Sequence, residues 1–286
     1  MHIIAKFKNW NSREEFLFFL FLESIILYNN LKEGYLMKRK QILIMNLILH
    51  SLVVILGSIA IAIQFKTTST NNSVSMGGWH VFRFFTNDGN IFCMVVSLIT
   101  MCHIIYSLVK GDEVLPKWIY ILNLMSAVSG LLIFFTVLFV LWPTLGPRLF
   151  VGYLMVVLHV VNPILVSTSF LLTMDKDTKI YEGFYGMVPM LVYGIPVITL
   201  IITKVWTGNL IPYPFLHVYD NPWWGTMLMM IGMLSFCSIL GIILTRITKR
   251  THLLEASKKK LLITLISLGI CLLSVTTLVV VLNIMY

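Results

Sequence analysis

The side chains best suited to chemistry in this sequence are a threonine and a histidine that stand far apart along the chain. Thr86 lies in the polar stretch FFTNDGN at residues 84–90, and His159 lies in the apolar segment at residues 149–173. A hydroxyl is a weak nucleophile until a base removes its proton, and imidazole suits that role near neutral pH. If the two segments are neighbouring helices, Thr86 and His159 form a candidate nucleophile and base.

Polar residues close to this pair in the sequence could complete such a site. Asn87, Asn90 and Asn162 carry amide groups that can donate hydrogen bonds to a developing oxyanion. Asp88 is the nearest carboxylate and the candidate to orient the histidine, as the acidic member of a triad does. On a helix, however, Asp88 projects about 160° away from the line of Thr86. A buried histidine that is satisfied by a neighbouring hydroxyl or carbonyl is the alternative.

The elements that carry these residues must be membrane-spanning helices. The chain has 286 residues, of which 58% are hydrophobic and 12% are charged, and its mean hydropathy is +0.90. Apolar runs recur with the length of about 20 residues that an α-helix needs to cross a bilayer. The alternation typical of a membrane barrel is absent from the sequence. The sequence therefore predicts an all-α, polytopic helical membrane bundle.

Six core spans and a C-terminal seventh span divide the sequence into three regions. Residues 1–36 form an N-terminal extension, which is either an interfacial helix or not translated, with translation then starting at Met37. Residues 37–247 form the six-helix core, and residues 248–286 form a basic linker and the seventh span. The expected spans cover residues 42–63, 80–108, 118–142, 149–173, 184–203, 227–245 and 261–285.

Polar and small residues form one line along the second span. At 100° per residue, five of them fall within about 40° of one line along the helix. They are Thr86, Asn90, Cys93, Ser97 and Thr100. Polar groups are costly in hydrocarbon, so this face should contact protein rather than lipid. The same pattern fits interhelical hydrogen bonding, so a functional role and a packing role both remain open.

Basic residues set the expected orientation. Of the 21 Lys and Arg residues, seventeen fall on one side of the predicted spans, and the other four are Lys66, Arg83, Arg148 and Lys204. Because Lys and Arg collect in cytoplasmic segments, we expect a multi-pass protein of the cell membrane with a cytoplasmic N-terminus and an extracytoplasmic C-terminus. This rule also accounts for the net charge of +9, so no nucleic-acid partner is expected.

The loop between the fifth and sixth spans is rich in aromatic residues and proline, and its centre carries Tyr213, Pro214 and Phe215. An aromatic belt at the membrane surface is the main interpretation, and a ligand site is the alternative. The sequence has no zinc-ligand spacing, no Gly-rich phosphate loop and no G-x-S-x-G elbow. We therefore expect no metal and no other cofactor.

Three stretches of the chain resemble a known family. FFTNDGN resembles the F-T-x-x-S-N signature of the Pr6Pr family of bacterial six-helix membrane proteins, with Gly89 where that signature has Ser. LHVVNP at residues 158–163 resembles the family's L-H-x-x-x-P, and YPFL at residues 213–216 resembles its Y-P-F-L. The family is similar in plan to the androgen-induced FAR/AIG-type membrane hydrolases, which split fatty acid esters of hydroxy fatty acids with an intramembrane threonine and histidine. The resemblance implies Thr86 as nucleophile and His159 as base.

Three functions remain open at this point. The first is a hydrolase of lipid acyl esters, in which Thr86 attacks the carbonyl and the lipid substrate enters from the bilayer. The bilayer itself is the one partner that the composition of the chain requires. The second is a small-solute transporter lined by the polar face, although the core shows no internal repeat of the kind that many transporters have. The third is a non-catalytic membrane scaffold in which Thr86 and Asn90 only lock helices together. The sequence assigns no oligomeric state.

Overall fold

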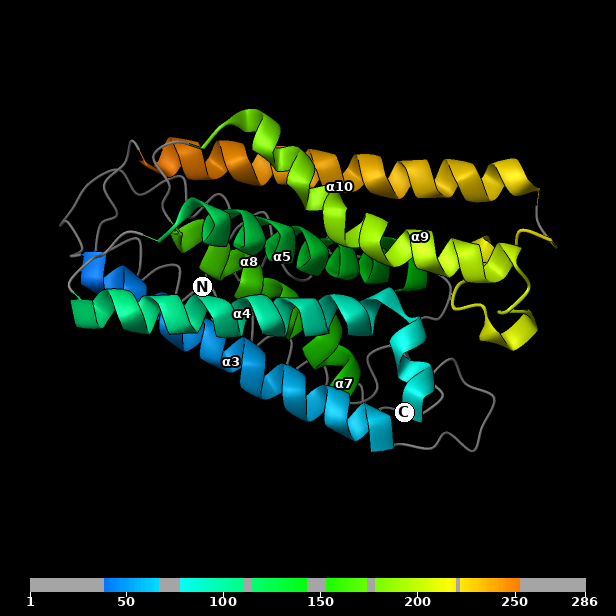
Figure 1. Cartoon of the computed structure of the whole chain (residues 1–286), viewed down its shortest axis with the longest axis horizontal. Helices are drawn as coiled ribbons and strands as arrows, with labels where there is room; N and C mark the ends of the chain where they lie inside the picture. Colours follow the sequence, from blue (N-terminus) through cyan, green and yellow to red (C-terminus); the bar gives the residue numbers. More distant parts are fainter. Residues whose placement is uncertain are drawn as a thin grey trace, which may run out of the picture. The chain divides into compact units, whose positions relative to one another are not determined.

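Six long apolar helices confirm the predicted class, an all-α membrane bundle (Figure 1). The computed structural model describes residues 39–66, 78–110, 115–142, 153–173, 178–219 and 222–252, and no strand occurs among them. The helices long and apolar enough to cross a bilayer are Lys40–Lys66, Phe85–Lys110, Lys117–Leu141, Leu154–Leu172, Ile180–Ile202 and Trp223–Thr248. The predicted N-terminal extension (1–36) and the predicted seventh span (261–285) lie outside the described residues.

Several spans combine an α-helix with a short 3-10 or π segment. The first two α-helices are α3 (Arg39–Lys66) and α4 (Phe85–Lys110), and the 3-10 helix η2 (Gly78–Arg83) precedes α4. The next two spans are α5 (Lys117–Thr136) with the π segment η3 (Val137–Leu141), and α7 (Tyr153–Val156) with the π segment η5 (Val157–Val161) and α8 (Asn162–Leu172). The last two are the 3-10 helix η6 (Ile180–Met187) with α9 (Val188–Ile202), and α10 (Trp223–His252), with η7 (Gly208–Leu210) and η8 (Pro214–Leu216) between them.

The start of the second span differs from the prediction. The sequence pattern places a helix from residue 80, whereas a separate 3-10 helix, η2, ends at Arg83 and α4 begins at Phe85. The main-chain N–H groups of Asn87 and Asp88 donate to the carbonyl of Phe84, at 3.0 and 3.3 Å. The polar stretch at residues 84–90 therefore forms the first turns of α4, and its hydroxyl, amide and carboxylate groups lie at the end of a span.

The π segment η5 lies directly before a proline. Its last turn is closed by the N–H of Asn162, which donates to the carbonyl of Val157, five residues earlier. In this pattern the carbonyl of Leu158 would need a donor at position 163, which is Pro163 and has no N–H. That carbonyl instead accepts a hydrogen bond from the side-chain amide of Asn90 on α4, at 2.9 Å. A side chain of another helix thus satisfies the group that the proline leaves open, as apolar surroundings require.

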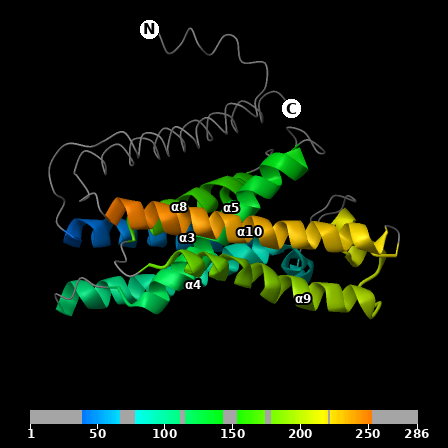
Figure 2. The same cartoon turned by 90° about the horizontal axis from the view of Figure 1, so that it is seen from above.

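Helix α5 lies between α10 and α4 in the view of Figure 1, and Figure 2 shows the same helices from above. Helix α5 contacts α4, α8, η6 and α10, and its side chains are buried over most of its length. By contrast, α9 and α10 expose large apolar side chains, among them Val192, Ile195 and Leu228. Such exposure suits helices that face lipid, because lipid tails are as apolar as these side chains. These exposed faces of α9 and α10 are therefore the ones expected to contact lipid.

The contact between α10 and η6 depends on two glycines. A β-carbon on Gly241 would overlap the carbonyl oxygen of Gly183, and a β-carbon on Gly183 would lie 2.6 Å from the Cα of Ile242. Only glycine allows the two main chains to approach this closely. Small residues serve this purpose in membranes, where helices associate by close packing and hydrogen bonds. The pair therefore fixes the position of the first part of the fifth span on α10.

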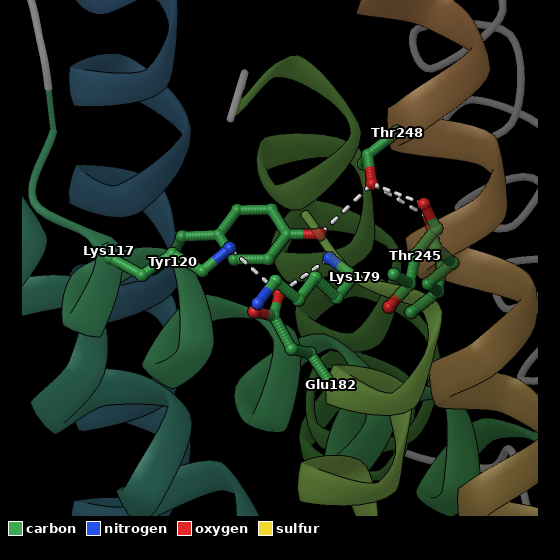
Figure 3. Close-up of polar contacts among 7 residues, drawn as sticks. Lys117, Tyr120, Lys179, Glu182, Thr245 and Thr248 are labelled. Atoms are coloured by element: carbon green, nitrogen blue, oxygen red, sulfur yellow. Dashed lines mark hydrogen bonds and ion pairs between the residues drawn. The ribbon is translucent and has the colours of Figure 1, made fainter. Parts of the chain in front are cut away.

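A polar cluster joins α5, η6 and α10 at one end of the bundle (Figure 3). Lys117 Nζ lies 2.8 Å from Glu182 Oε2, and the same oxygen accepts the main-chain N–H of Lys179 at 3.1 Å. Beside this pair, the hydroxyl groups of Tyr120 and Thr248 are 3.1 Å apart. Glu182 is only 6% exposed, so the ammonium group and the N–H offset the cost of burying its charge. The cluster fastens the three elements to one another.

Candidate intramembrane site

An apolar pocket lies at the opposite ends of these helices, where α4, α9 and α10 meet η3 and the loop that contains η8. Its empty volume is about 590 Å³, a figure that includes space open to the outside. The polar side-chain groups among the described residues that line it are four hydroxyls, those of Thr86, Thr136, Tyr193 and Tyr213. The rest of its wall is aliphatic and aromatic and includes three methionines. The pocket thus combines an apolar interior with a few hydroxyl groups.

Tyr213 lies beside Thr86 in this pocket, although a long stretch of chain separates them. The main-chain N–H of Phe85 donates to the hydroxyl oxygen of Tyr213 at 3.0 Å. Burial raises the pKa of Tyr213 to about 12, against smaller opposing effects of hydrogen bonding with the main chain of Phe85 and Thr86 and with the side chains of Thr86 and Tyr193. The phenol therefore stays protonated at neutral pH. It lies within hydrogen-bonding reach of the Thr86 hydroxyl.

Aromatic packing and main-chain contacts hold the loop against the start of α4. The ring of Tyr213 stacks on Phe215 with centroids 5.4 Å apart, and it meets Phe84 edge-on at 5.9 Å. The guanidinium of Arg83 donates to the carbonyl of Asn209 at 3.0 Å. Burial lowers the pKa of Arg83, but a guanidinium remains charged throughout the physiological range. Of the loop residues predicted to lie near the site, Tyr213 and Phe215 line the pocket with Thr86, and Pro214 begins η8 between them.

The three asparagines predicted to stabilise an oxyanion, Asn87, Asn90 and Asn162, already form hydrogen bonds within the protein. Asn90 donates both of its amide hydrogens, to the carbonyls of Thr86 at 2.7 Å and Leu158 at 2.9 Å. Its carbonyl oxygen accepts from Asn162 Nδ2 at 3.0 Å. Asn87 Nδ2 donates to the carbonyl of Val81 at 2.6 Å. The structure thus shows these amides joining segments of the protein, and two buried oxygens, those of Asn87 and Asn162, have no hydrogen-bond partner among the described residues.

His159 is buried on η5, at 6% exposure, and its side chain bonds within its own helix. Its Nδ1 lies 2.8 Å from the carbonyl of Met155, so Nδ1 carries a hydrogen and the neutral ring leaves Nε2 as the basic nitrogen. His159 is not among the residues that line the pocket, and within the described part of the chain no hydrogen bond joins it to Thr86. The two segments nevertheless meet, because Asn90 bonds the main chain of Thr86 and that of Leu158, next to the histidine.

Asp88 is half-buried in the first turns of α4. Its carboxylate forms no ion pair or hydrogen bond with a side chain of the described residues, but it is near enough to Tyr193 to act on that phenol electrostatically. A negative charge in the first turn of a helix is favourable because it faces the positive end of the helix dipole. The orienting partner of His159 is the Met155 carbonyl, and Asp88 instead adds negative charge near the pocket.

The polar face predicted along α4 is confirmed as a contact with protein. Asn90, Cys93, Ser97 and Thr100 are each at most 2% exposed. Cys93 Sγ donates to the carbonyl of Ser126 on α5 at 3.4 Å, and Thr100 Oγ1 accepts from Asn123 Nδ2 on α5 at 3.0 Å. Thr86, at the end of this face, is half-buried and opens into the pocket. One line of residues thus serves helix packing along most of its length and faces a cavity at its end.

A buried network around His50 is the main feature that the sequence did not reveal. His50 Nδ1 is 3.0 Å from Ser97 Oγ, and its Nε2 is 2.8 Å from Ser169 Oγ. Ser169 donates to Asn46 Oδ1 at 3.1 Å, so Nε2 must be the donor to Ser169. Ser97 then donates to Nδ1 of the neutral ring. The spacing of Asn46 and His50, four residues apart on one helix face, was the available signal.

Comparison of the chain with protein-family models, with curated proteins and with solved structures finds no match.

Proposed function

We propose that this integral membrane protein binds the acyl chain of a lipid in the pocket beside Thr86 and hydrolyses an ester of that lipid. The observation that carries the proposal is the place of the Thr86 hydroxyl in a pocket whose wall is otherwise almost wholly apolar. An acyl chain could pass from the bilayer into a pocket with such an apolar wall without crossing water. The three methionines suit a flexible chain, because their unbranched side chains adapt to irregular shapes.

In this proposal Thr86 is the nucleophile and His159 is the base. The hydrogen bond from Nδ1 to Met155 gives His159 the tautomer that a base needs, with a free lone pair on Nε2. The bridge made by Asn90 keeps the two main-chain segments together. The two side chains would have to approach one another on substrate binding, since catalytic hydrogen bonds often tighten only in the complex. Asn87, Asn90 and Asn162 would each have to exchange a present hydrogen bond to serve an oxyanion.

The resemblance to the Pr6Pr family and to the FAR/AIG-type hydrolases supports this proposal, and the six spans agree with the family's plan. The distribution of Lys and Arg supports a cell-membrane location with a cytoplasmic N-terminus and an extracytoplasmic C-terminus. With that orientation, the pocket opens in the outer half of the bilayer. The substrate would then be a lipid of the outer leaflet.

Labelling with a fluorophosphonate probe tests the hydrolase. The full chain, purified in lipid nanodiscs, should be labelled, and Thr86→Ala and His159→Ala should each abolish labelling. Thr199→Ala is the matched control, because Thr199 is an exposed threonine of α9 that bonds only to its own helix. Labelling that persists in both site variants would reject the hydrolase. Loss in Thr86→Ala alone would keep the nucleophile and require another base.

The interhelical hydrogen bonds of α4 favour a scaffold as the second candidate. Ser97, Thr100 and Asn90 each bond to a different partner helix, which is what helix locking requires. The same bonds disfavour the transporter, because the side chains of a solute path would have to face an open channel. If the protein is a scaffold, Thr86→Ala and Asn90→Ala should lower its thermal stability, and the purified wild-type chain should take up no fluorophosphonate probe.

A further inference from the structure

The hydroxyl of Tyr213 has a fixed position in the pocket. The hydroxyl oxygen of Tyr213 accepts a hydrogen bond from the N–H of Phe85. The ring of Tyr213 stacks on Phe215 and meets the ring of Phe84 edge-on. A donor held in place before the ligand arrives loses little freedom on binding, which strengthens its contribution. Acceptance of a hydrogen bond also polarises the phenol, so its own hydrogen becomes a better donor.

The other hydroxyls of the pocket are less suited to hold a ligand oxygen. The hydroxyl of Tyr193 is committed to the carbonyl of Arg83, at 2.6 Å. Thr86 stands next to Tyr213 and is the group proposed to react. Thr136 belongs to another element and is the last residue of α5, where η3 begins. A ligand atom that bonds to Tyr213 would therefore lie directly beside Thr86.

The charges around the pocket indicate what kind of oxygen this is. No Lys, Arg or His is among the described residues that line it, so nothing in its wall would neutralise a carboxylate or a phosphate. Asp88 adds a negative charge near Tyr193, which would repel an anion. Burial of an unpaired anion is costly, whereas an uncharged carbonyl needs only one donor. The pocket therefore suits a neutral acyl ester better than a free fatty acid.

We propose that Tyr213 donates its hydroxyl hydrogen to the carbonyl oxygen of the bound acyl group, and that the pocket thereby selects neutral acyl esters over free fatty acids. This inference rests on the proposed acyl-binding function but not on hydrolysis. On this model, the carbonyl carbon lies next to the Thr86 hydroxyl, and the chain lies along the methionine-rich wall formed by α9 and α10. Tyr213 then determines which lipids bind and how they are oriented.

The test is a comparison of two proteins with three photoreactive ligands. The ligands share one diazirine-bearing chain and end as a methyl ester, a methyl ether without the carbonyl, or a free acid. Wild-type protein in nanodiscs should prefer the ester to the ether by about threefold to tenfold, the effect of one hydrogen bond. Tyr213→Phe should bind the ether as wild type does and should lose the preference for the ester. The acid should bind more weakly than the ester to both proteins at neutral pH.

The control variant is Tyr181→Phe, because Tyr181 is 59% exposed on η6, at the other end of the bundle. It should keep the wild-type preference. Unchanged binding of the ether by Tyr213→Phe shows that the variant is folded, since the ether lacks the carbonyl oxygen to which the phenol is proposed to donate. A preference for the ester that survives Tyr213→Phe, or equal binding of ester and ether by wild type, would overturn the inference alone. Binding of neither ligand to wild type would overturn the proposed function as well.

Discussion

Asn90 offers the sharpest test of how this bundle holds the candidate site together. The side chain is 1% exposed and makes three hydrogen bonds, of which those with Leu158 and Asn162 join different helices. The bond to Leu158 supplies a donor that Pro163 lacks. Asn90→Leu keeps the volume but removes all three bonds, and it leaves the Leu158 carbonyl and the Asn162 amide without these partners.

The expected cost follows from these contacts. Interhelical hydrogen bonds in membrane proteins contribute on average about 0.6 and at most about 1.7 kcal/mol each. An unsatisfied buried carbonyl adds about 1–3 kcal/mol. Asn90→Leu should therefore lower the free energy of unfolding by about 2–4 kcal/mol. Asn123→Leu is the matched comparison, because Asn123 is also buried but bonds the Thr100 hydroxyl and a carbonyl of its own helix. Its cost should be about 1 kcal/mol.

Reversible unfolding in mixed micelles, followed by tryptophan fluorescence, measures both variants. The decisive comparison repeats Asn90→Leu in a Pro163→Ala background, which supplies a main-chain N–H at position 163. In that background the Leu158 carbonyl has a donor in its own chain, so Asn90→Leu should cost at least about 1 kcal/mol less than in wild type. An equal cost in the two backgrounds would refute the explanation that Asn90 compensates for the proline.

Three further predictions concern other contacts of the fold. Gly241→Ala should destabilise the protein by more than about 2 kcal/mol, because its β-carbon meets the main chain of η6. Gly232→Ala on the same helix places its β-carbon in open space, so it should be neutral or slightly stabilising. Thermal unfolding measures both variants. Tyr120→Phe should cost about 1 kcal/mol in the same assay, because it removes the hydrogen bonding of the hydroxyl with Thr248 of α10 and with Thr178. The pKa of Tyr213 rises from 10.0 to about 12 in the folded protein, so the unfolded chain loses this proton first and stability should fall between pH 10 and 12. Tyr213→Phe should make that fall smaller, and an unchanged pH profile would contradict the assignment.

Residues in the stretches that resemble the family also form hydrogen bonds that hold the structure together. Asn90 and Pro163 stand in two of the three resembling stretches, and the structure joins them through the carbonyl of Leu158. Tyr213, in the third, accepts a hydrogen bond from Phe85, in the first. A pattern shared with a family can therefore reflect how these segments are fastened together as well as how they react. Variants of Thr86 and His159 are therefore needed to distinguish a structural reason for the shared pattern from a catalytic one.

The sequence by itself determined the six spans and the inward direction of the polar face of α4. Spans need about 20 apolar residues, and polar side chains in hydrocarbon must find protein partners, so both follow from local pattern and solvent. Helical periodicity does not say which helices are neighbours. It therefore did not reveal the His50 network, which brings together residues of α3, α4 and α8.

Only the tertiary structure decided the surroundings of the two candidate catalytic residues. The π segment η5 adds a residue to one turn, so regular α-helical spacing does not give the position of His159 relative to its neighbours. The loop residue Tyr213 reaches Thr86 because aromatic packing and a main-chain N–H hold it at the start of α4. Both outcomes depend on contacts between segments that are distant in the chain. Such contacts are set by how whole helices pack, and no local pattern encodes them.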